Sequence, residues 1–166
     1  MPSDRSNWEH LFARLTETPL QIALVCTGGG AGAVSRCFRR SGASRNFVDA
    51  AIPYSMRASA AYLGDAPAES RASAEFASQL ASRAYSRATR LSDCDQGVPI
   101  GLALVAALPT VPVNQTEERI HVALHRQQDQ QCWSERLRKG EHSRESAESI
   151  ADEMLFGAIE YAVDQS

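Results

Sequence analysis

Residues 21–30 read Gln-Ile-Ala-Leu-Val-Cys-Thr-Gly-Gly-Gly, an apolar run that ends abruptly in three glycines. A helical pattern follows at once, with Val34, Cys37 and Phe38 on one side. The stretch therefore predicts a buried strand, a tight turn and a helix from about Ala31 to Arg40. Consecutive glycines allow positive φ angles and let a ligand approach the main chain closely, because no Cβ stands in the way.

The start of the helix after this turn is a candidate anion site. Its first N–H groups have no partner within the helix and carry the positive end of the helix dipole, so a phosphate or a carboxylate is their natural occupant. We therefore predict that Thr27, Gly28, Gly29 and Gly30 bind an anion. The alternative is that the glycines only make a sharp corner between strand and helix, and the sequence leaves both interpretations open.

The composition is that of a globular protein of ordinary size. The chain has 166 residues, a formal net charge of −3 and 43% hydrophobic residues, which predicts a single domain over residues 1–166 with a substantial core. No apolar run approaches the roughly 20 residues that span a bilayer, and residues 1–18 lack the apolar centre of a secretion signal. We therefore expect no membrane partner and a cytoplasmic location.

The charged and metal-ligating residues argue against further classes of function. The four cysteines lack the paired spacing of a zinc site or a CxxC redox motif, so we expect reduced, mostly buried thiols, no metal and no cofactor. His121 and His125 would lie about 13 Å apart on a strand, too far for one ion, and we expect them on a solvated face. The acidic balance disfavours nucleic acid as a partner, although a local basic patch is formed by Arg36, Arg39, Arg40 and Arg45.

Hydrophobic periodicity predicts the other elements. Helices are expected over residues 7–16, 54–63, 70–91 and 143–163, and strands over residues 21–26, 100–108, 119–126 and 131–139. The strand over 100–108 is apolar on both alternating faces, as a central strand covered on two sides must be. The strand over 119–126 alternates and is expected to be half exposed or edge-like. Residues 46–52 form a segment of uncertain type, and residues 65–68 a short connector.

The order of these elements predicts the fold class. Helices that alternate with strands, and one late antiparallel hairpin, indicate an α/β protein with a single three-layer α/β/α sandwich and a mixed, mostly parallel sheet. The small residues of 70–91 predict close packing of that helix on the sheet. In such open sheets ligands lie outside the carboxyl ends of the strands, which is where the glycine turn is expected.

Four short motifs follow one another as they do in a known protein family. Residues 23–29 read Ala-Leu-Val-Cys-Thr-Gly-Gly, residues 42–44 Gly-Ala-Ser, residues 53–55 Pro-Tyr-Ser and residues 143–145 Ser-Arg-Glu. In this order they resemble an Ala-Glu-Ser-Cys-Thr-Gly-Gly signature, a Gly-Ser-Ser step, a Tyr-Ser step and an Asp-Arg-Asp helix start. These belong to the CinA C-terminal domain family, the nicotinamide-nucleotide amidohydrolases. The resemblance covers roughly residues 7–163 and implies a three-layer α/β fold.

The family resemblance also implies a reaction, but the residues that perform it are missing here. Family members hydrolyse the carboxamide of nicotinamide mononucleotide and release ammonia, with a serine nucleophile and a lysine and a tyrosine nearby. In this chain the serine position is Val25, the lysine position is Ser59, and the glycine-rich loop after the central strand is altered at residues 105–109. Nucleophilic catalysis needs a nucleophile and a group that takes its proton. We therefore predict that amidohydrolase activity is lost or altered, and we assign no catalytic residue.

Cys26, Thr27 and Ser55 are the alternative nucleophiles. A helix N-terminus lowers the pKa of a thiol, but Cys26 and its neighbour Val25 point to opposite faces of a strand. No histidine is placed near Thr27 or Ser55 in the sequence to act as a base, so hydrogen-bond donation is the expected role of both. Tyr54 is either a pocket residue or a core residue, and the sequence does not distinguish the two.

The predicted function is that of a CinA-like pseudoenzyme that binds a small phosphate-bearing nucleotide. The expected substrate-binding residues are Thr27, Gly28, Gly29, Gly30, Tyr54, Ser55 and Arg144. An arginine fits badly with the helix dipole at the start of the last helix, which suggests an anion-binding role for Arg144; a surface salt bridge with Glu141 or Glu148 is the alternative. An active amidohydrolase with a reassigned nucleophile is the first alternative function, and a structural domain that forms a homo-oligomer is the second.

Overall fold

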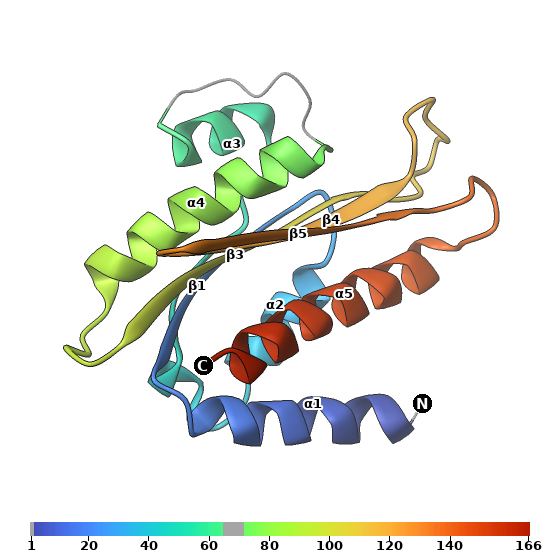
Figure 1. Ribbon diagram of the computed structural model, residues 1–166. Helices are drawn as coiled ribbons and strands as arrows, with labels where there is room; N and C mark the ends of the chain where they lie inside the picture. Colours follow the sequence, from blue (N-terminus) through green and yellow to red (C-terminus); the bar gives the residue numbers. More distant parts are fainter. Residues whose placement is uncertain (1, 65–71) are drawn as a thin grey trace.

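A computed structural model describes residues 2–64 and 72–166 (Figure 1). Its elements are, in chain order, α1 (Pro2–Thr16), β1 (Leu20–Thr27), α2 (Ala31–Phe38), a 3-10 turn (Ala43–Arg45), β2 (Phe47–Ala51), α3 (Met56–Tyr62), α4 (Ala74–Leu91), β3 (Val98–Ala107), β4 (Arg119–Arg126), β5 (Asp129–Arg136) and α5 (Arg144–Asp164). Every strand expected from the sequence is present, and the segment of uncertain type, residues 46–52, contains β2.

The described strands form a five-stranded sheet with the order β2-β1-β3-β4-β5. β1 pairs in parallel with β2 and β3, whereas the β3–β4 and β4–β5 pairs are antiparallel. Because β4 alone runs against its neighbours, four of these five strands point the same way, and the expected mixed, mostly parallel sheet is confirmed. In the parallel register Thr27 lies opposite Val105, so β1 and β3 end at the same edge of the sheet.

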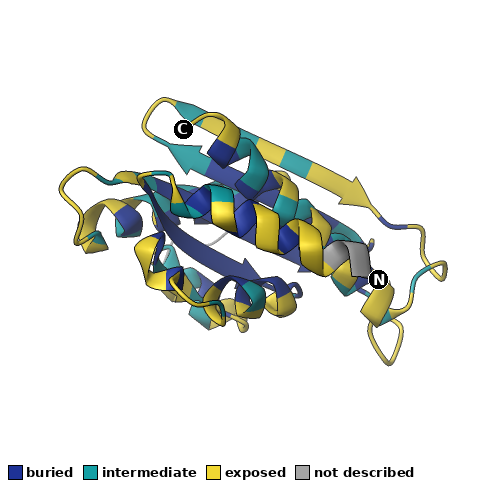
Figure 2. Ribbon diagram, turned by 90° about the horizontal axis from the view of Figure 1, so that it is seen from below, coloured by how far each residue is buried: buried dark blue, intermediate teal, exposed yellow. Residues whose placement is uncertain are grey.

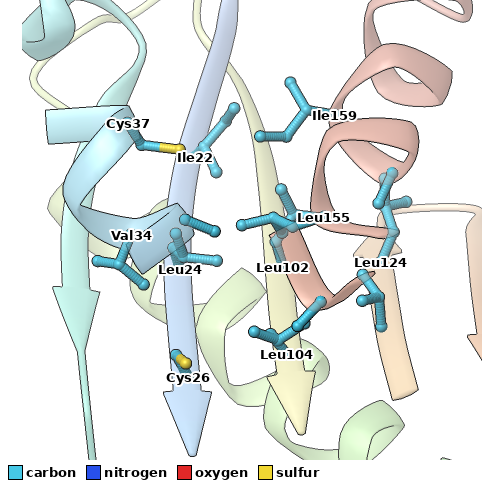
Figure 3. Packing of buried hydrophobic residues seen from close by; sticks show 14 of the residues in the cluster. Ile22, Leu24, Cys26, Val34, Cys37, Leu102, Leu104, Leu124, Leu155 and Ile159 are labelled. Atoms are coloured by element: carbon cyan, nitrogen blue, oxygen red, sulfur yellow. The ribbon is translucent and has the colours of Figure 1, made fainter. Parts of the chain in front are cut away.

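Large apolar side chains fill the space between the sheet and the layer of α1, α2 and α5 (Figures 1 and 3). Alternate residues of a strand point to the same face, so β1 and β3 each present a row of apolar residues to this layer. The labelled side chains from the two strands and from α5 point toward one another, as Leu24, Leu102 and Leu155 do. All three are at most 1% exposed, which makes this face the main core of the molecule.

The opposite face of the sheet is lined by small residues and covered by α4. Ala23, Val25, Ala103 and Val105 point to this side and are packed against the helix. A Cβ placed on Gly101 would lie only 2.1 Å from the carbonyl oxygen of Ala81 and 2.2 Å from the main-chain nitrogen of Tyr85, both in α4. The helix therefore approaches the sheet at backbone distance, and the expected close packing of this helix is confirmed.

The structure corrects the expected environment of β4. This strand is covered on both faces, and the edge position belongs to β5, whose side chains are mostly exposed (Figure 2). His121, expected on a solvated face, is 8% exposed and its Nδ1 lies 2.7 Å from the Ser134 hydroxyl oxygen. Burial, reinforced by the charge of Arg119, lowers the pKa of this imidazole. The alternation of residues 119–126 therefore gave a wrong prediction of exposure. A histidine can be buried when a neighbouring strand supplies a hydrogen-bond partner.

Element boundaries differ from expectation in several places. The N-terminal helix begins at Pro2 instead of Asn7, and the last strand runs over 129–136 instead of 131–139. α4 begins at Ala74, because the hydroxyl of Ser73 accepts a hydrogen bond from the N–H of Phe76 and so caps the helix. The expected helix start at Ser70 and the expected connector over 65–68 lie outside the described residues. Within the described residues, no helix is both long and apolar enough to cross a membrane.

Candidate anion-binding site

The glycine turn after β1 is packed against the end of β3. A Cβ on Gly28 would lie 1.9 Å from the carbonyl oxygen of Ala106, and one on Gly30 would lie 1.6 Å from a methyl carbon of Leu104. Both glycines also have positive φ angles, +83° and +85°, a conformation that other residues rarely adopt. The glycines at these two positions are thus required by the corner itself, whatever the turn binds.

The main-chain N–H group at the end of the turn, just before α2, already binds a carboxylate of the protein. The main-chain N–H of Gly30 donates to Oε2 of Glu148 at 2.6 Å. The other carboxylate oxygen, Oε1, lies 3.0 Å from Nε of Arg144 and 3.0 Å from its Nη2. The N-terminus of α2 and a guanidinium therefore converge on one carboxylate, as the helix dipole favours.

Arg144 joins the last helix to the glycine turn. Its Nη2 donates to the carbonyl oxygen of Gly28 at 3.1 Å, and its Nη1 to that of Pro109 at 3.4 Å. Arg144 opens α5, where the hydroxyl of Ser143 caps the helix by accepting from the N–H of Ser146. The arginine thus approaches the glycine turn, and the salt bridge with Glu148 that the sequence left as an alternative is also present. The side chains of Arg144 and Glu148 are 41% and 32% exposed, so solvent reaches the pair.

Thr27, Tyr54 and Ser55 gather on the other side of the turn. The hydroxyl of Thr27 donates to the carbonyl oxygen of Pro53 at 2.9 Å, and the hydroxyl of Ser59 donates to the same oxygen at 3.0 Å. Ser55 caps α3, since its hydroxyl accepts from the N–H of Ala58 at 3.1 Å. Tyr54 is 67% exposed and is therefore not a core residue. The loop between β2 and α3 is held at the carboxyl end of β1 by these bonds to Pro53.

Val25 and Ser59, the positions at which the sequence resemblance predicts replaced catalytic residues, are both buried. Val25 is fully buried against α4, and Ser59 is 3% exposed. Cys26 points to the opposite face, where its thiol donates to the carbonyl oxygen of Gly29 at 2.8 Å. Burial, with smaller contributions from Glu148 and another acid on α5, raises the pKa of this thiol to about 12, so it is protonated at neutral pH.

The hydroxyl groups of Thr27, Ser55 and Ser59 are hydrogen-bonded to main-chain groups. Among the described residues, none of the side chains of Thr27, Ser55 and Ser59 is hydrogen-bonded to a histidine, lysine or carboxylate. Lys139 donates to the carbonyl oxygens of Asn114 and Thr116 in the loop before β4. The part of the chain that the structure describes also contains no group of three or more His, Cys, Asp and Glu side chains able to hold a metal ion.

Glu148 is the residue whose position the sequence did not reveal. The sequence indicates it only as a surface partner of Arg144, four residues earlier on the same helix. Its second role, as the ligand of the N–H of Gly30, depends on how α5 lies across the sheet. No local pattern signals a contact between residues so far apart in sequence.

Comparison with known proteins gives matches in structure only. No known protein-family profile and no curated protein matches the sequence. A CinA superfamily protein from Klebsiella pneumoniae superimposes with a TM-score of 0.76, over 97% of this chain and 98% of that one, at 9% sequence identity. A CinA superfamily protein from Escherichia coli gives 0.73, over 95% and 87%, at 13% identity. The chain has the CinA fold.

A third solved structure agrees at somewhat lower similarity. The competence/damage-inducible protein CihA from Agrobacterium tumefaciens superimposes with a TM-score of 0.63 over 96% of this chain and 91% of that one, at 14% identity. The resemblance to CinA proteins that four short motifs indicated in the sequence is therefore confirmed in the fold. At these low sequence identities the similarity extends to the fold alone. The function depends on the residues of the site.

Proposed function

We propose that this CinA-fold protein binds a small phosphate-bearing nucleotide at the glycine turn and does not hydrolyse amides. The observation that carries the proposal is the carboxylate of Glu148, held between the N–H of Gly30 and the guanidinium of Arg144. This carboxylate stands where the anion of a ligand would sit. A turn that binds an internal anion has the hydrogen-bond donors and the dipole direction that a phosphate needs.

A phosphate would replace the Glu148 carboxylate on the same donors. It carries more charge than a carboxylate and offers three acceptor oxygens, and the planar guanidinium of Arg144 is suited to binding two of them. The partial exposure of Arg144 and Glu148 gives a ligand access to the pair. Binding then requires Glu148 to swing aside, so the internal carboxylate acts as a competitor that lowers the affinity for phosphate.

The other predicted residues would contact the nucleoside. Tyr54 offers a largely exposed aromatic ring at the carboxyl edge of the sheet, and aromatic rings stack on bases without preference for sequence. Ser55 and Thr27 lie in the same region, joined through the hydrogen bond from Thr27 to Pro53. A phosphorylated nucleotide is also the kind of ligand that a cytoplasmic protein encounters, in keeping with the location expected from the sequence.

Arg144→Ala is expected to weaken nucleotide binding tenfold to hundredfold. Loss of charge-assisted hydrogen bonds costs about 1.5–3 kcal/mol of affinity, which corresponds to that range. Isothermal titration calorimetry with nicotinamide mononucleotide and with inorganic phosphate measures the effect. Arg138→Ala is the matched control, because Arg138 is an exposed arginine whose salt bridge is with Glu141, outside the glycine turn.

The outcomes of this titration separate the candidate functions. A wild-type protein that binds neither ligand at about millimolar concentration, which corresponds to about −4 kcal/mol, would contradict the proposal. It would leave the structural, oligomer-forming role as the remaining function. Equal affinity in Arg144→Ala and the wild type would place any nucleotide site elsewhere on the molecule.

Purified protein is expected to release no ammonia from nicotinamide mononucleotide. Val25 offers no nucleophile, Ser59 offers no base, and the Cys26 thiol is held protonated. A coupled ammonia assay at saturating substrate measures this. Turnover on the order of 1 per second, an ordinary rate for an enzyme, would instead support an amidohydrolase with a reassigned nucleophile. The double variant Val25→Ser, Ser59→Lys is expected to recover little activity, because Val25 is fully covered by α4.

A further inference from the structure

A second cationic feature lies at the other end of α2, away from the glycine turn. A groove of about 660 Å³ is lined by residues of α1, of α2 and of the segment that follows α2. Its lining is strongly basic and partly aromatic and consists of Arg5, Trp8, Glu9, Phe12, Arg36, Arg39 and Arg40. In a chain whose formal net charge is −3, four arginines around one groove are a marked local concentration of positive charge.

Two of these arginines are balanced by carboxylates. Arg36 lies 3.3 Å from Asp152 of α5, and Arg5 lies 3.1 Å from Glu9 of the same helix. The Arg5–Glu9 pair is almost fully in solvent, with side chains 87% and 67% exposed. Exposed pairs at this spacing contribute little, so Arg5 is readily released to another partner.

Arg39 and Arg40 carry the uncompensated charge. Among the described residues, no carboxylate lies within ion-pair distance of either guanidinium. Both follow Arg36 at helical spacing of three and four residues, so the three side chains lie on one face of α2 and its C-terminal end. The helix dipole favours cations there, but that effect does not explain the arginine that α1 contributes to the opposite wall.

The Arg40 guanidinium is held in place before any ligand arrives. It lies 4.7 Å from the ring centre of Phe12 and 5.9 Å from that of Phe47. Its Nη1 donates to the hydroxyl of Thr16 at 3.2 Å, and its Nη2 to the side-chain oxygen of Asn46 at 3.5 Å. A fixed guanidinium loses little freedom on binding an anion, which favours a specific site over diffuse attraction.

We infer that this groove binds a compact polyanion of the diphosphate class, such as the diphosphate group of a nucleotide. Arg39, Arg40 and the releasable Arg5 approach the groove from two helices, and arginine recognises phosphate oxygens in pairs. The groove volume falls in the range of small-molecule sites, about 300–1,000 Å³. A long nucleic acid is disfavoured by the negative net charge of the chain, by Glu9 in the lining of the groove and by Asp152, which is paired with Arg36.

The test uses inorganic pyrophosphate and the fluorescence of Trp8, which lines the groove. Trp133→Phe removes the other tryptophan of the chain and leaves Trp8 as the reporter. At low ionic strength we expect a saturable change with a dissociation constant below about 1 mM. Arg39→Ala should weaken binding about tenfold and the Arg5→Ala, Arg39→Ala double variant about a hundredfold, on the scale of charge-assisted bonds.

Two control variants test whether pyrophosphate binds in the groove and not at another arginine. Arg138→Ala removes an exposed arginine elsewhere and should leave the affinity unchanged. Arg144→Ala removes the cation at the glycine turn and should also leave it unchanged, so this site and the proposed nucleotide site can fail independently. No saturable signal, an equal loss in Arg138→Ala, or tighter binding of a single-stranded oligonucleotide than of pyrophosphate would overturn the inference. Circular dichroism melts confirm that each variant is folded.

Discussion

Glu148→Gln is expected to raise the affinity for nicotinamide mononucleotide and for inorganic phosphate about tenfold to hundredfold. The carboxylate of Glu148 now occupies the N–H of Gly30 and the guanidinium of Arg144, and a ligand must displace it from both. A neutral amide makes weaker bonds to these donors than a carboxylate does, by about 0.7–1.4 kcal/mol each, and no longer repels a phosphate. Two such bonds correspond to the expected range.

Calorimetry on the wild type, Glu148→Gln and Glu145→Gln measures this gain. Glu145 lies on the same helix beside Arg144 and is exposed, so Glu145→Gln changes the net charge equally without touching the glycine turn. The control should therefore bind like the wild type. A Glu148→Gln variant that binds no more tightly than this control would show that the internal carboxylate does not compete with a ligand.

Gly101→Ala is expected to lower the free energy of unfolding by about 3 kcal/mol or more. The added Cβ would meet the backbone of α4 at 2.1 Å and 2.2 Å, and main-chain atoms inside a hydrogen-bonded helix cannot rotate out of the way. The helix must shift away from the sheet, which opens gaps along the whole interface with β1 and β3. Losses of this size are rare for one methyl group and indicate a backbone clash.

Urea unfolding of Gly101→Ala and Gly157→Ala tests the close approach of α4. Gly157 lies in α5, and a Cβ there meets nothing within 4 Å. Alanine is a better helix former than glycine by about 0.5–1 kcal/mol, so Gly157→Ala should be slightly stabilised. A Gly101→Ala protein as stable as the wild type would mean that α4 does not approach the sheet at backbone distance.

The fold could be predicted from the sequence because its decisive signals are local. The apolar run that ends at Gly28 and the apolar run that begins at Ile100 indicate two central strands, and alternation indicates the strand over 119–126. Residues 46–52, which contain β2, give no clear signal. Local sequence patterns do not predict the burial of a side chain where contacts with distant segments determine it. The alternation of residues 119–126 predicts a solvated His121, whereas in the structure α4 covers β4 and Ser134 on β5 supplies a hydrogen-bond partner.

The candidate site was predictable only in part. A glycine turn at the carboxyl end of a central strand follows from the local pattern, and Arg144 is singled out by its unfavourable position at the start of a helix. The occupation of the turn by Glu148 could not be foreseen, because it depends on the rotation and tilt of α5 over the sheet. Binding by Thr27, Tyr54 and Ser55 stays a prediction that the titrations above address.

The strand order of the sheet has a consequence for how the molecule folds. The antiparallel half closes over short connections, since Arg126 pairs with Asp129 across a tight hairpin. The parallel half is different, because Leu20 pairs with Val98, which is far away along the chain. This pair forms only when the long loop between the two residues closes. Closing a longer loop costs more chain entropy, and pairings distant in sequence form slowly. We expect β3, β4 and β5 to form an early nucleus, and the docking of β1, which brings Gly30 to Glu148, to complete the native state.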